Sequence, residues 1–240
     1  MKFVQPEGKN PLDNGNVVGK PFDRIDGPLK VSGQAPYSFE YRKEAPNPAY
    51  GWIVLSGIAK GRIRSIDITA AHASEGVLLV YTHETVPNKT VSGNSLVSQL
   101  TGPDIVHHGQ PVAFVVAETL EQARAAAVLV KVDYEVAEGR YDLRAQLPLM
   151  AAPPEDPSGW GDKADTSVGD FEGAFASAQV SIDATYSTPD QHPAMMEPQA
   201  TTAVWNGDRL TIYTSNQMAN WVASAVASMV GVPRENVRAV

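Results

Sequence analysis

The sequence contains no cysteine in its 240 residues. This absence excludes disulfide bonds, thiolate zinc sites and cysteine-ligated iron–sulfur clusters from the chain itself. Positive charge is also scarce, because 19 lysine and arginine residues stand against 27 aspartate and glutamate residues, for a net charge of -8. A surface of this sign repels phosphate backbones and anionic lipid headgroups. We therefore expect neither a nucleic-acid partner nor electrostatic attachment to a membrane.

Long apolar runs are missing as well. No stretch of 18 or more apolar residues is present, so no membrane-spanning helix is predicted. The first 20 residues are polar, and they lack both the apolar core of a secretory signal and a twin-arginine pair. These observations leave the compartment open. The 43% hydrophobic and 19% charged residues are typical of a globular protein with one large or two modest domains.

The common catalytic motifs are absent too. There is no phosphate-binding loop, no dinucleotide fingerprint, no H-E-x-x-H and no G-x-S-x-G. The five histidines are scattered, and His107 and His108 would point to opposite faces of a strand, so no metal site is predicted. Glu197 has the chemistry of a general base, but a lone carboxylate is more often a structural acceptor. No catalytic residue is assigned in this chain.

Composition divides the chain into four stretches. Residues 1–45 are rich in turn signals and are interpreted as an N-terminal arm that packs on other parts of an assembly. Residues 46–138 alternate strand and helix patterns, residues 139–166 form a Pro/Gly-rich linker, and residues 167–240 begin a second unit. In the second stretch, strands are expected over 51–58, 63–68 and 77–82, with a short helix over 70–74.

A β–α–β pattern is the clearest local signal. The apolar run 112–117 predicts a buried strand, and Thr119 with Gln122 forms a capping box at the start of a helix whose apolar residues continue to Val130. Val130, Val132 and Tyr134 then alternate with polar residues, as in a half-buried strand.

The last stretch predicts a helix over 171–178, a strand over 180–186, and two strands, 195–205 and 210–214, about the turn Asn206-Gly207-Asp208. A helix capped by Ser215 or Asn216 should end at Gly231. A final strand over 237–240 has little length in which to pair, so we expect further polypeptide to follow; a short edge strand is the alternative.

Several of these segments resemble one known family. The matching residues are Val17 to Pro21, Arg24 to Gly27, Lys30 to Gly33, His108 to Ala113, Val168 to Phe171, Tyr186 to Gln199 and Ser215 to Gln217. In this order and spacing they resemble the N-terminal portion of the molybdenum-cofactor subunit of the aldehyde oxidase/xanthine dehydrogenase family. Bacterial three-subunit periplasmic aldehyde oxidoreductases are the most similar members. The resemblance implies an α/β (α+β) fold, in which an a/b hammerhead domain precedes the incomplete start of a molybdopterin-binding domain.

The resemblance also implies a reaction. Family members hydroxylate aldehydes or N-heteroaromatics with oxygen from water, on a molybdenum cofactor (molybdopterin, here expected as the cytosine dinucleotide). Electrons then pass to iron–sulfur clusters and FAD, which are expected on an iron–sulfur subunit and an FAD subunit. We expect the chain to act as part of such a complex and to be inactive alone.

Gln191 is the one cofactor-binding residue that the resemblance identifies. It falls where the family places a glutamine that hydrogen-bonds an oxo ligand of molybdenum, and a neutral amide donates such a bond without adding charge. The alternative is a loop glutamine bonded to nearby backbone. The family's glycine-rich loop and catalytic glutamate have no counterpart here and are expected in the remaining C-terminal molybdopterin-binding part. A competing hypothesis is a non-catalytic scaffold or small-ligand-binding module with the same fold.

Overall fold

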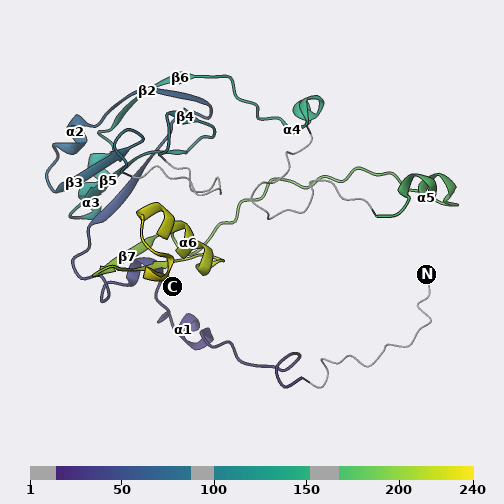
Figure 1. The fold of residues 1–240 in the computed structure, drawn as a ribbon, viewed down its shortest axis with the longest axis horizontal. Helices are drawn as coiled ribbons and strands as arrows, with labels where there is room; N and C mark the ends of the chain where they lie inside the picture. The colour runs from purple at the N-terminus through teal and green to yellow at the C-terminus, as the bar shows by residue number, and fades with distance from the viewer. Residues whose placement is uncertain (1–14, 88–99, 152–167) are drawn as a thin grey trace.

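The computed structural model describes residues 15–87, 100–151 and 168–240. Figure 1 shows strands and helices gathered into two packed units, from which α1, α4 and α5 extend on long connecting stretches. Part of the predicted linker, residues 152–166, lies outside the described residues. Its earlier part forms two short turns of helix, α4 (Leu143–Gln146) and η4 (Leu147–Leu149).

The first unit contains two antiparallel sheets. One has the order β1-β5-β3, from Tyr50–Leu55, Pro111–Ala117 and Val77–Thr82; the other has the order β4-β2-β6, from Asp104–Ile105, Gly61–Asp67 and Lys131–Val136. Two helices complete it, α2 (Thr69–His72) against β3 and α3 (Leu120–Ala127) across β1 and β5. Its core joins Val80 and Val115 of the sheet to Ala126 and Ala127 of the helix.

The elements of the predicted β–α–β pattern are confirmed, and their two strands belong to different sheets. β5, α3 and β6 follow in the expected order, although α3 ends at Ala127 rather than near Val130. β6 pairs with β2 in the second sheet, because both edges of β5 are already occupied by β1 and β3. A strand has only two hydrogen-bonding edges, so the helix carries the chain from one sheet to the other.

The second unit is a three-stranded sheet covered by a helix. β7 (Thr201–Asn206) and β8 (Arg209–Thr214) form a hairpin, and α6 (Ala219–Val230) leads through η5 (Arg234–Asn236) to β9 (Val237–Ala239). The predicted turn is confirmed: Asn206 pairs with Arg209 across a two-residue loop, in which Gly207 has φ +62°. Buried side chains from β8, α6 and β9 form the core: Leu210, Ile212, Ala223, Ala227 and Val237.

The final strand is confirmed, and although it is only three residues long it pairs at the edge of the sheet. β9 runs parallel to β8, with Leu210 opposite Val237 and Ile212 opposite Ala239. Three residues suffice because Val237 is buried against Leu210 beneath α6. The stop of α6 is also confirmed, since Gly231 adopts the left-handed conformation at φ +72°.

Three predictions about the second unit are wrong. Residues 180–186 form no strand in the described chain, and Val180 and Ile182 are exposed, because alternation alone supplies no partner for a ladder. The strand expected from residue 195 begins only at Thr201, after Pro198, which has no N–H to donate. The Asn216 side chain accepts a hydrogen bond from the Met218 N–H in a turn before α6, and the helix itself begins at Ala219.

Three further short elements precede or connect the two units. The arm contains α1 (Gly27–Val31) and the 3-10 helix η2 (Ser38–Glu40), neither of which was predicted. Between the units, α5 (Phe171–Ser177) confirms the helix expected over 171–178, and its N-cap Asp170 accepts a hydrogen bond from the Gly173 N–H at 2.9 Å.

Candidate functional site

Gln191 lies in the middle of residues 178–200, the extended segment between α5 and β7 (Figure 1). Its side chain is exposed, and its Nε2 lies 3.4 Å from the Pro189 carbonyl oxygen. At this length the hydrogen bond is weak, so the amide N–H groups are available to another acceptor. This geometry is compatible with both interpretations of Gln191, a donor to a cofactor and a loop glutamine bonded to its own backbone.

The extended segment is held by few hydrogen bonds. Met195 N–H donates to the Pro193 carbonyl at 3.0 Å, and Gln199 Nε2 approaches the Met195 sulfur at 3.8 Å. Both are local contacts, and Pro189, Pro193 and Pro198 keep the backbone from joining a ladder. The conformation of the segment therefore depends on where its ends are attached.

Glu197 provides such an attachment. Its Oε1 accepts hydrogen bonds from the Ser38 backbone N–H at 3.2 Å and from the Ser38 hydroxyl at 3.4 Å. Ser38 is only 6% exposed, whereas Glu197 is half-buried. The interpretation of Glu197 as a structural acceptor is therefore confirmed by its partners.

The Ser38 region is in turn bound to the hairpin. Thr202 Oγ1 in β7 donates to the Ser38 carbonyl at 2.8 Å, and the Tyr41 ring stacks on Tyr213 of β8 with centroids 4.0 Å apart. Within the turn, Tyr37 N–H donates to Glu40 Oε2 at 2.7 Å. Residues 37–41, which we name the connector, therefore fasten the predicted arm to the second unit.

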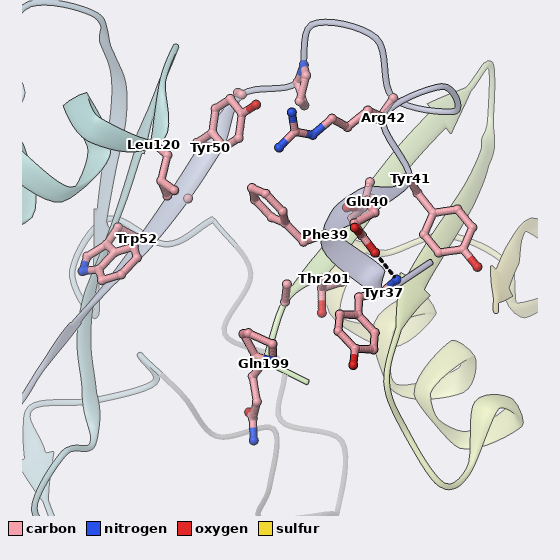
Figure 2. Close-up of a pocket in the computed structure, with 18 residues that line it drawn as sticks. Tyr37, Phe39, Glu40, Tyr41, Arg42, Tyr50, Trp52, Leu120, Gln199 and Thr201 are labelled. Carbon is pink, nitrogen blue, oxygen red and sulfur yellow. Dashed lines mark hydrogen bonds between the residues drawn. The ribbon is translucent and has the colours of Figure 1, made fainter. Parts of the chain in front are cut away.

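A cavity of about 530 Å³ opens between the connector, β1 and β7. Figure 2 shows Phe39, Tyr50 and Trp52 around it, with Gln199 and Thr201 on the β7 side. Gln191 does not line this cavity. The cavity was not predicted from the sequence; the closely spaced aromatic residues Tyr37, Phe39 and Tyr41 are the signal that could have pointed to it. Its aromatic walls suit apolar or planar groups rather than a metal ion.

Metal ligands do not gather in the described ranges. Among residues 15–87, 100–151 and 168–240, no three histidine, aspartate or glutamate side chains lie close enough to hold an ion. A metal carried inside an organic cofactor, however, requires hydrogen-bond donors from the protein more than side-chain ligands. The exposed Gln191 amide is a donor of this kind.

No helix in the described part of the chain is long and apolar enough to cross a bilayer.

Both units of the chain are similar to domains of known proteins. The a/b hammerhead domain of aldehyde oxidase and xanthine dehydrogenase matches residues 32–138, and a molybdopterin cofactor-binding domain matches residues 155–240. The aldehyde oxidoreductase molybdenum-binding subunit PaoC of Escherichia coli (strain K12) is 50% identical over 99% of this chain. The nicotinate dehydrogenase large molybdopterin subunit of Eubacterium barkeri is 26% identical over 92% of the chain. The chain spans 32% of the Escherichia coli relative and 52% of the second one.

Solved structures agree on the fold. The aldehyde oxidoreductase of Desulfovibrio gigas superposes with a TM-score of 0.68 at 23% identity, over 90% of this chain and 26% of that one. Quinoline 2-oxidoreductase of Pseudomonas putida 86 gives a TM-score of 0.71 at 22% identity, over 90% of this chain and 29% of that one. At these identities the likeness concerns the fold alone.

Proposed function

Because this chain belongs to the aldehyde oxidase and xanthine dehydrogenase family, we propose that it is the N-terminal part of a molybdenum-cofactor subunit that oxidises aldehydes with oxygen from water. The predicted fold, an a/b hammerhead domain followed by the start of a molybdopterin-binding domain, is confirmed. N-heteroaromatic substrates are the second candidate class.

One observation supports the aldehyde class above the others. The 50% identity to an aldehyde oxidoreductase subunit extends over 99% of the chain, so it includes both units and the segment that carries Gln191. Relatives whose names refer to nicotinate and nicotine are 26% and 28% identical. We accordingly propose a small aldehyde as the substrate.

In this proposal the protein and the cofactor have separate tasks. The molybdenum cofactor, when bound, supplies the redox chemistry and the transfer of oxygen to the substrate carbon. The Gln191 amide would donate a hydrogen bond to an oxo ligand of the metal and so help to hold the group without adding charge. Since these 240 residues contain no cysteine, we place the clusters that carry the electrons outside them, on the proposed iron–sulfur subunit.

The proposed partners follow from this division. They are the remaining C-terminal molybdopterin-binding part, with the glycine-rich loop and the catalytic glutamate, an iron–sulfur subunit and an FAD subunit. The cytosine dinucleotide form of the cofactor is proposed on the same basis. The chain alone should therefore show no turnover.

The proposal is tested by isolating the intact complex from the native host through an affinity tag on this protein. Molybdenum and iron should co-purify with it, and oxidation of an aldehyde in ¹⁸O-labelled water should place the label in the carboxylate product. A metal-free, monodisperse protein that forms no complex and does not oxidise aldehydes would contradict the proposal and favour a scaffold or ligand-binding module.

The role of Gln191 has its own test. Gln191→Ala should lower kcat in the complex by about 10- to 100-fold, the range typical of residues that hydrogen-bond a metal's ligands. Gln34→Ala, which removes another exposed glutamine, is the matched control and should leave kcat unchanged. An equal kcat for wild type and Gln191→Ala would contradict the proposed role of Gln191 at the cofactor.

A further inference from the structure

Glu197 lies six residues after Gln191 and makes a long-range contact. Among the described residues of the extended segment 178–200, the hydrogen bonds of Glu197 to Ser38 are those that join it to a distant part of the chain. Gln191 is therefore separated from its nearest attachment point by a short stretch that contains Pro193. Proline fixes φ near -65° and so reduces the conformational freedom of this stretch.

The Ser38 N–H needs this acceptor. Ser38 is the first residue of η2, where the backbone N–H has no partner within the helix, and it is only 6% exposed. A buried donor without an acceptor is costly, so the carboxylate of Glu197 satisfies a group that would otherwise be unpaired. The hydrogen bond from Thr202 and the Tyr41–Tyr213 stack hold the connector against the hairpin β7–β8. Ser38 is therefore itself held in place relative to the second unit.

From this geometry we infer that Glu197 is a positioning residue: its bond to the Ser38 N–H sets the location of Gln191 relative to the second unit. The connector of the N-terminal arm thus takes part in building the cofactor site, although it lies more than 150 residues away in sequence. This inference rests on the proposed function for its catalytic consequence, but the attachment itself does not depend on it.

The first test measures hydrogen exchange by mass spectrometry in the intact complex, on peptides covering residues 37–41 and 189–198. Glu197→Ala should speed exchange of the Ser38 amide by at least about tenfold, because this N–H loses its charged acceptor, and should also speed exchange across residues 189–198. Glu197→Gln keeps an oxygen acceptor at the same place and should stay close to wild type. Glu138→Ala removes an exposed carboxylate elsewhere and serves as the matched control.

Substitutions at Ser38 distinguish the contribution of its backbone N–H from that of its hydroxyl. Ser38→Ala removes only the hydroxyl, whose contact is the longer one, and should change exchange little. Ser38→Pro also removes the N–H at the first position of η2, where proline is tolerated and where Tyr37 already has the extended ψ of 162° that proline requires. Ser38→Pro should therefore speed exchange across residues 189–198 as Glu197→Ala does. If Glu197→Ala fails to fold, Ser38→Pro tests the attachment in its place.

The second test asks whether the attachment acts through Gln191. Glu197→Ala should lower kcat by about tenfold, with KM for the aldehyde within about twofold of wild type, because Glu197 does not touch the substrate. Adding Gln191→Ala to Glu197→Ala should then cause no more loss than Gln191→Ala alone. Glu197→Gln should restore most of kcat.

Two results would overturn the inference: exchange in Glu197→Ala equal to wild type, or effects of Glu197→Ala and Gln191→Ala on kcat that simply multiply. Failure of the proposed function is recognised separately, because the wild-type complex would then lack molybdenum and aldehyde oxidation. The exchange comparison would still decide whether Glu197 holds the segment in place.

Discussion

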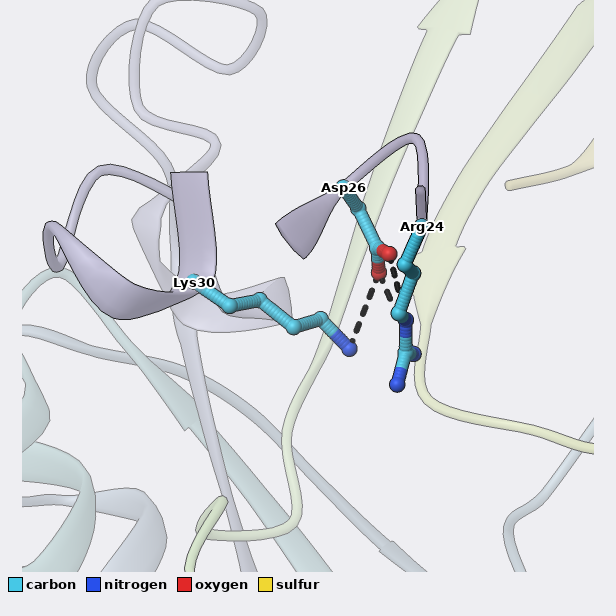
Figure 3. Close-up of polar contacts among 3 residues, drawn as sticks. All are labelled: Arg24, Asp26 and Lys30. Atoms are coloured by element: carbon cyan, nitrogen blue, oxygen red, sulfur yellow. Dashed lines mark hydrogen bonds and ion pairs between the residues drawn. The ribbon is translucent and has the colours of Figure 1, made fainter. Parts of the chain in front are cut away.

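Asp26 lies between two cations at the start of α1 (Figure 3). Arg24 Nε is 2.5 Å from one carboxylate oxygen, and Lys30 Nζ is 3.0 Å from the other. The hydrogen bond from Arg24, followed by that from Lys30, lowers the pKa of Asp26 from 3.8 to about 2. The side chains of Arg24, Asp26 and Lys30 are 70%, 42% and 51% exposed, so salt should weaken the cluster.

A pH titration checks this cluster. Because the pKa is lowered in the folded protein, the stabilisation is present above about pH 4 and is lost as the pH falls through about 2. The ¹³C carboxyl resonance of Asp26 should titrate near 2 and shift toward 3.8 in Arg24→Gln, with a smaller shift in Lys30→Gln. A wild-type midpoint near 3.8 would show that the cluster does not form in solution.

Single residues also mark the limit of prediction from sequence. The capping role of Thr119 could be predicted because its partner, Gln122, is three residues away. The partner of Glu197 could not, because Ser38 is brought to it only by the fold. Nothing local distinguishes a carboxylate that binds a distant N–H from one that faces water.

At the scale of elements, two reciprocal hydrogen bonds between Thr119 and Gln122 stabilise the N-terminus of α3. The Thr119 hydroxyl accepts a hydrogen bond from the Gln122 N–H at 3.2 Å, and the Gln122 side chain accepts one from the Thr119 N–H at 3.0 Å. The helix has eight residues and would be marginal alone, so its ends and its buried alanines both matter.

Removing this cap should be measurable. Thr119→Ala should lower the free energy of unfolding by about 1 kcal/mol, because the hydroxyl acceptor at the N-cap is lost. Thr119→Ser keeps the oxygen and is the control, expected close to wild type in a urea titration. If Thr119→Ala and Thr119→Ser unfold at the same urea concentration, the capping hydrogen bond does not contribute.

Elements were predictable where their stabilising contacts are local. The hairpin about Gly207 and the stop at Gly231 follow from backbone conformations that glycine adopts easily. The strand expected over 180–186 depended on a neighbour, and the alternation of Val180, Ile182 and Tyr186 did not reveal whether one was present.

At the scale of the whole molecule, the two units are joined by the connector. Its contacts reach β7 through Thr202 and β8 through Tyr213, while the chain continues directly into β1. The same stretch lines the aromatic cavity of Figure 2 together with Trp52 of β1. The relative placement of the units thus depends on a few side chains rather than on a continuous sheet.

The Tyr41–Tyr213 stack should therefore be energetically coupled. The rings lie 4.0 Å apart at 16°, and a double-mutant cycle with Tyr41→Leu and Tyr213→Leu should give a coupling of about 0.5–1.5 kcal/mol in the free energy of unfolding. Pairing Tyr41→Leu with Leu replacement of the distant, exposed Tyr141 is the control and should give additive effects. Additivity in the first cycle would mean that the stack does not hold the units together.

By itself, the sequence determined the order of most strands and helices, their turns and caps, and the family, because these depend on short-range patterns and on spacing along the chain. Only the tertiary structure decided that β6 leaves the sheet of β5, that β9 joins β8, and that Ser38 supports Glu197. The physical reason is the same in each case. A hydrogen bond between residues distant in sequence forms only after folding has placed the donor next to its acceptor, and the same holds for two strand edges. The sequence around either residue alone does not show which distant group will be its partner.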